Sequence, residues 1–143
     1  MNKYLIALAV LSANASAEVT VTNPWARATV AQQKASGAFM VLRSSKDARL
    51  VGVETSVAGM AELHEMKMDA NVMHMNAVDS IFLPAGKDVA LASGGKHLML
   101  MGLKQQLKEG DTVTLTLTVE GKDGKRETVT VKAPVKPLSY QPK

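Results

Sequence analysis

The chain of 143 residues contains no cysteine. This absence excludes disulfides, iron–sulfur clusters, thiolate metal sites and cysteine nucleophiles. Aromatic residues are scarce as well, at 3% of the chain, so a packed core must be mostly aliphatic. The formal net charge is only +4, and the lysines are scattered with few aromatic neighbours. Faces that bind nucleic acid combine clustered cations with aromatic rings, so we expect no nucleic-acid partner.

The first 17 residues have the three parts of a secretory signal peptide. Lys3 is followed by the apolar run 5–11 and by three small residues that end at Ala17. The run is too short to span a bilayer as a helix, and no cysteine follows it to carry a lipid. A buried N-terminal helix is the alternative. We expect cleavage after Ala17, which leaves an exported chain that begins at Glu18 and has no membrane span.

The rest of the chain has the pattern of short strands separated by turns. In 112–119 every second residue is apolar, as on a strand with one buried face. Clusters of Gly, Pro, Asn, Asp and Ser separate the segments, which predicts an antiparallel sandwich or barrel. The expected strands are 18–22, 37–43, 49–57, 61–67, 72–78, 87–91, 97–102, 112–120 and 127–132.

The sequence predicts one domain and little helix. Only 103–109 could form a helical turn, and Pro134 and Pro137 are expected to close the last strand. The predicted organisation is a signal peptide over 1–17, a β-sandwich domain over 18–133 and a polar, mobile tail over 134–143.

Methionine is the anomaly of the composition. The chain has nine methionines, and all three of its histidines lie within a few residues of methionine clusters. In a strand 97–102, His97 and Met99 share one face and Leu98 the other, because side chains alternate. Either face could be the core side. Seven methionines fall within 60–101: Met60, Met66, Met68, Met73, Met75, Met99 and Met101.

The segments 61–67 and 72–78 can be paired as a hairpin. A loop at Asp69-Ala70 would place His64 opposite Met75, with their Cβ atoms about 4.5–5.5 Å apart. A four-residue loop keeps the same register. Ala70 suits a type I′ turn poorly, which favours the longer loop.

Imidazoles and thioethers together form a soft, neutral ligand set. Such ligands suit Cu(I), whereas zinc rarely takes thioether ligands. Methionine also keeps a sulfur ligand in compartments where paired thiols oxidise. The alternative is that the methionines only fill space in an apolar core.

The spacing of these residues resembles that of the periplasmic PCuAC-type copper chaperones. Their signature is a histidine, ten residues, a methionine, twenty-one residues and His-x-Met, and it is matched by His64, Met75, His97 and Met99. Further similar segments include 25–27, 61–65, 84–86, 97–103 and 110–111, so the likeness covers essentially all of 18–133. The resemblance implies a cupredoxin-like antiparallel β-sandwich of Greek-key type.

The resemblance further implies that His64, Met75, His97 and Met99 bind one Cu(I) ion. It implies a monomeric, non-enzymatic periplasmic protein that delivers copper to the CuA centre of cytochrome c oxidase, directly or through a thiol-containing partner chaperone. Electron transfer of the blue-copper kind is excluded because it needs a cysteine ligand. The competing hypotheses are a metal-free adhesion or binding module and a protein that buffers copper for tolerance.

The residues outside this signature have weaker predictions. His74 falls on the strand face opposite to Met75, so we expect it at the surface. Four methionines are expected to be packing residues, with an outer-shell role at the metal as the alternative: Met66, Met68, Met73 and Met101.

Overall fold

The structure is a computed structural model that describes residues 18–142. The predicted signal peptide, 1–17, lies outside the described residues. Between residues 18 and 142 there is no α-helix, and therefore no helix that could cross a membrane. The described residues form ten strands: β1 (Val19–Arg27), β2 (Ala35–Ser44), β3 (Ala48–Thr55), β4 (Ala58–Asp69), β5 (Val72–Val78), β6 (Ile81–Leu83), β7 (Asp88–Leu91), β8 (His97–Leu103), β9 (Thr112–Gly121) and β10 (Arg126–Lys136).

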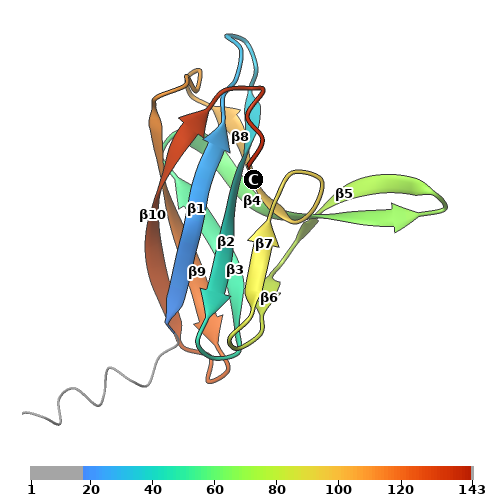
Figure 1. Ribbon diagram of the computed structural model, residues 1–143, viewed down its shortest axis with the longest axis vertical. Helices are drawn as coiled ribbons and strands as arrows, with labels where there is room; N and C mark the ends of the chain where they lie inside the picture. Colours follow the sequence, from blue (N-terminus) through green and yellow to red (C-terminus); the bar gives the residue numbers. More distant parts are fainter. Residues whose placement is uncertain (1–17, 143) are drawn as a thin grey trace, which may run out of the picture.

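The strands build two layers that pack face to face (Figure 1). One sheet has the order β5-β4-β8-β2-β1, with β7 also paired to β2, and we call it the site sheet. The second sheet has the order β10-β9-β3-β6. A short parallel pairing of β1 with β10 joins the two, and every other strand pair is antiparallel. The expected antiparallel β-sandwich is confirmed.

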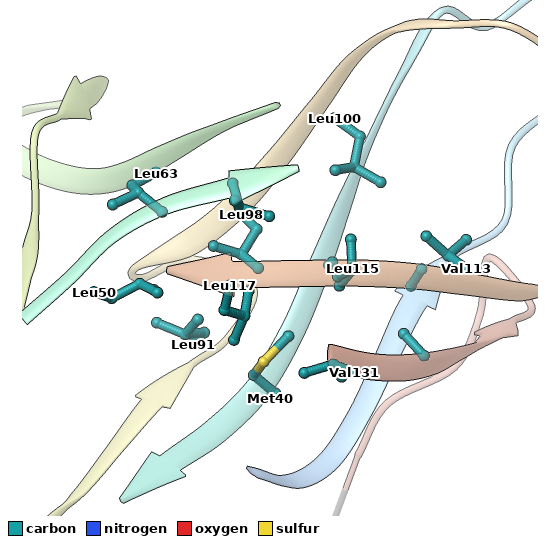
Figure 2. Packing of buried hydrophobic residues seen from close by; sticks show 14 of the residues in the cluster. Met40, Leu50, Leu63, Leu91, Leu98, Leu100, Val113, Leu115, Leu117 and Val131 are labelled. Carbon is teal, nitrogen blue, oxygen red and sulfur yellow. The ribbon is translucent and has the colours of Figure 1, made fainter. Parts of the chain in front are cut away.

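The core between the sheets is aliphatic (Figure 2). Leu98 and Leu100 of β8 are fully buried and face Leu115 and Leu117 of β9 across the sandwich. The alternation predicted for 112–119 is therefore confirmed. Because β8 alternates, its leucines fill the core and its methionines take the outer face of the site sheet. This settles the choice that the sequence left open.

Two local predictions are wrong, and one short strand is not predicted. Residues 103–109 contain no helix, because Leu107 is buried and bonds through its backbone to Thr29. Strand β6 is too short to have been expected. Strand β10 continues through Pro134, which pairs with Thr112, so the sandwich extends to Lys136 rather than ending at residue 133.

The residues after β10 return to the site sheet. The ring of Tyr140 packs edge-on against Trp25 with a centroid distance of 4.8 Å. Arg27 also donates a hydrogen bond to the carbonyl of Leu138. The segment expected to be a mobile tail therefore contacts the start of the domain.

The β4–β5 hairpin projects from the sandwich (Figure 1), and its register differs from the prediction. Ala70 and Asn71 both have positive φ, at 50° and 67°, as a two-residue type I′ turn requires. Met66 therefore lies opposite Met75, and His64 lies opposite Ala77 rather than opposite Met75. The shift is two residues, so every side chain keeps its predicted face.

Candidate metal centre

The two histidines of the signature are neighbours on the outer face of the site sheet. His64 of β4 pairs directly with His97 of β8 in the antiparallel ladder. Their ring centroids lie 5.6 Å apart. The long-range pairing of β4 with β8 thus brings together two residues that are 33 positions apart in the sequence.

Each of the two imidazoles has a polar contact at one ring nitrogen, and the described residues give the other nitrogen no hydrogen-bond partner. Nε2 of His64 lies 2.8 Å from Oε1 of Glu62, and Nδ1 of His97 donates to the carbonyl of Gly95 over 2.8 Å. Nδ1 of His64 is buried and has no hydrogen-bond partner among residues 18–142. Metal-binding histidines usually donate their second N–H to a carboxylate or backbone carbonyl in this way. Both rings are therefore arranged to offer a lone pair to a metal ion.

The thioethers converge on one cavity beside these rings. A cavity of about 370 Å³ is lined by Met66, Met75, His97 and Met99, among others. Three of the four predicted ligands thus face one space, and His64 adjoins it through His97. Within the described part of the chain, no group of three or more acidic or histidine side chains is arranged to hold a metal ion.

The aromatic ring of Phe39, on β2, forms part of the cavity lining. Phe39 lies over Gly37, where an added Cβ would come within 2.8 Å of the ring, and its centroid is 6.2 Å from that of His97. The guanidinium of Arg27 sits 4.9 Å above the Trp25 ring and 5.5 Å above the Phe39 ring. These contacts fix the position of the ring against which His97 rests.

Strand alternation predicts two pairs on shared faces, His64 with Met75 and His97 with Met99, and the structure brings both pairs to the outer face of the site sheet. Met66, which is expected to be a packing residue or to lie in the outer shell of the metal, lines the same cavity as Met75. The signature does not include Glu62, although strand alternation puts it on the same face as His64. His74 is exposed, as predicted.

The fold and this arrangement define a cupredoxin-like β-sandwich that carries a histidine–methionine cluster on its outer face. Residues 19–135 match the model of the LpqE-like family, described as "Putative lipoprotein LpqE-like". "Putative lipoprotein Lxx21020" of Leifsonia xyli subsp. xyli is 35% identical over 122 residues, which are 85% of this chain and 71% of that protein. The chain belongs to the LpqE-like family.

Solved structures agree with this assignment. The copper-bound PCuAC domain from PmoF2 is 26% identical, with a TM-score of 0.66 over 83% of this chain and 92% of that domain. The Cu(I) form of DR1885 from Deinococcus radiodurans is 34% identical, with a TM-score of 0.59 over 90% and 85% of the two chains. The resemblance to PCuAC-type proteins that the signature predicted is confirmed.

Proposed function

We propose that this protein is an extracytoplasmic copper chaperone that binds one Cu(I) ion reversibly through His64, Met75, His97 and Met99. The observation that carries the proposal is the buried, unpartnered Nδ1 of His64 beside the second free imidazole. An unpaired buried nitrogen is costly unless a ligand satisfies it. The relatives solved with copper bound support the choice of metal.

The donor set favours Cu(I) over other ions. Two neutral imidazoles and two thioethers carry no charge, and soft sulfur ligands prefer a soft monovalent ion. Zn(II) would be held poorly, because its sites normally use histidine, thiolate or carboxylate ligands. Met75 and Met99 line the same cavity, so both thioethers can contribute to one site.

The position of the site suits transfer rather than permanent storage. The cluster lies on the outer face of a sheet, and Met75 is exposed while His97 is buried. A partner's ligand can therefore replace the exposed thioether first, while the histidines still hold the ion. We infer that the receiving protein is the CuA-bearing subunit of cytochrome c oxidase or a thiol-containing chaperone that serves it, in the periplasm.

Leucine substitutions test the metal assignment. Met75→Leu with Met99→Leu keeps volume and apolarity but removes both sulfurs, so folding should persist while Cu(I) affinity falls. The measurement is an anaerobic titration against a chromophoric Cu(I) chelator. Met60→Leu is the control, because Met60 is exposed and does not line the cavity. If the double variant binds Cu(I) as tightly as the parent, the thioethers are packing residues and the proposal fails.

Transfer needs its own test. The Cu(I)-loaded protein is mixed with the metal-free CuA domain of an oxidase subunit, and native mass spectrometry follows the copper. Movement of copper to the CuA domain supports a chaperone. Retention of copper under these conditions, also in the presence of a thiol-containing chaperone, would favour a buffering role in copper tolerance.

A further inference from the structure

The projecting β4–β5 hairpin carries a row of methionines that the proposed copper site does not fully use. Met66 pairs with Met75 and Met68 pairs with Met73, and all four lie on one face. We call this row the methionine ladder. Asp69 and Val72 pair across the two-residue turn. In an antiparallel hairpin with such a turn, the pair that flanks the turn is the hydrogen-bonded one, so the methionine pairs fall at the non-hydrogen-bonded positions, where opposed side chains lie closest.

Packing does not account for the ladder. Met68 is 60% exposed, Met73 is 50% exposed and Met75 is 46% exposed. The opposite face of the hairpin carries Lys67 and Asp69 among other polar side chains. The expectation that Met68 and Met73 are packing residues is therefore wrong. The hairpin presents its apolar sulfur-bearing face to solvent, although ordinary folding would favour burying it.

The ladder is continuous with the proposed copper site. Met66 and Met75, its inner pair, line the cavity together with His97 and Met99. His97 is only 6% exposed, whereas Met75, which lines the same cavity, is 46% exposed and belongs to the ladder. Opposed Cβ atoms about 4.5–5.5 Å apart let long, flexible methionine side chains bring their sulfurs to one ion.

We propose that Met66, Met68 and Met73 form a second, weaker site for Cu(I), made only of thioethers. This site holds the ion near the tip of the hairpin and passes it along the ladder to and from the cavity. Three neutral sulfurs suit a soft monovalent ion and exclude hard divalent ions. The proposal rests on the proposed function, because it takes the same ion as its cargo.

A titration with Ag(I), an air-stable ion of the same closed-shell type, tests the second site. The exported chain, with ¹³C-labelled methionine methyl groups, is followed by NMR and by native mass spectrometry. The first equivalent should shift the methyl signals of Met75 and Met99. The second should shift those of Met68 and Met73 and leave Met60 unmoved. Met60 is a strict control because it is 55% exposed and also lies opposite a methionine, Met101.

Variants separate the two sites. Met68→Leu with Met73→Leu should lose the second equivalent of Ag(I) and keep the first. His64→Ala with His97→Ala should weaken binding of the first equivalent and keep the methyl shifts of Met68 and Met73. The proposal is overturned if the leucine variant still binds two equivalents, or if the Met60 methyl moves together with that of Met68, which would indicate adventitious binding to any exposed methionine.

Failure of the proposed function gives a different result. If the histidine variant binds the first equivalent as tightly as the parent, the main site is misassigned. The leucine variant still tests, independently, whether Met68 and Met73 bind the second equivalent.

Discussion

Glu62 should set the copper affinity without touching the metal. Its carboxylate lies 2.8 Å from Nε2 of His64, which holds the imidazole so that Nδ1 is the free nitrogen. Losing such an orienting partner typically lowers metal affinity about 10- to 100-fold, which is roughly 1.4–2.8 kcal/mol. The Glu62 side chain is about a third exposed, so solvent screens part of its charge. We therefore expect Glu62→Ala to fall near the lower end, at about 10-fold.

A graded series separates charge from hydrogen bonding. The amide oxygen of Glu62→Gln can still accept the imidazole N–H, so this variant should lose less affinity than Glu62→Ala. Competition for Cu(I) with a chromophoric chelator measures both, and circular dichroism checks that the fold persists. Glu65→Ala is the matched control, because Glu65 lies on the opposite face of the same strand. Glu62→Ala with the affinity of the parent would refute the orienting role.

Three further perturbations follow from the fold. Leu117→Ala removes a side chain that is fully buried between the sheets, and chemical denaturation should show a loss of about 2–5 kcal/mol. Gly37→Ala should displace the ring of Phe39, which lowers stability by about 1–3 kcal/mol and weakens Cu(I) binding. Gly52→Ala is the control and should do neither, because a Cβ added at Gly52 makes only ordinary van der Waals contacts. N-terminal sequencing of the exported protein should begin at Glu18, and retention of the first 17 residues would contradict the predicted cleavage.

Alternation along a strand predicts which residues share a face, but it predicts neither the pairing of the strands nor which face turns outward. An even shift in register leaves each side chain of the hairpin on its face, so the prediction that His64 and Met75 share a face holds although their pairing is wrong. The alternation of 97–102 leaves open which of its faces turns outward. The pairing between β4 and β5 depends on the position of the hairpin turn. Asn71 tolerates positive φ better than most residues, and that preference was the signal that could have placed the turn at Ala70-Asn71.

Pairing between strands that are distant in the sequence accounts for the wrong prediction of where the last strand ends. Proline lacks a backbone N–H and usually ends a strand. Pro134 lies opposite Thr112, the first residue of β9, where the ladder ends and the missing donor matters little. Strand β10 then continues because Val135 pairs with Ala26 of β1. No local pattern in the sequence reports that parallel contact.

The histidine–methionine cluster lies on the outer face of the site sheet because of the way that β8 is oriented. One face of this strand turns toward the core and the other turns outward. A histidine turned into the aliphatic core would leave both ring nitrogens without partners, at a cost of about 1–3 kcal/mol for each. On the outer face, Nδ1 of His97 reaches the carbonyl of Gly95. The period of two then carries Met99 outward with His97 and turns Leu98 inward, where it is fully buried. Strand β8 thus supplies leucines to the core of the sandwich and soft ligands to its outer face. The hydrogen-bonding needs of the His97 imidazole favour this orientation of the strand over the reverse one.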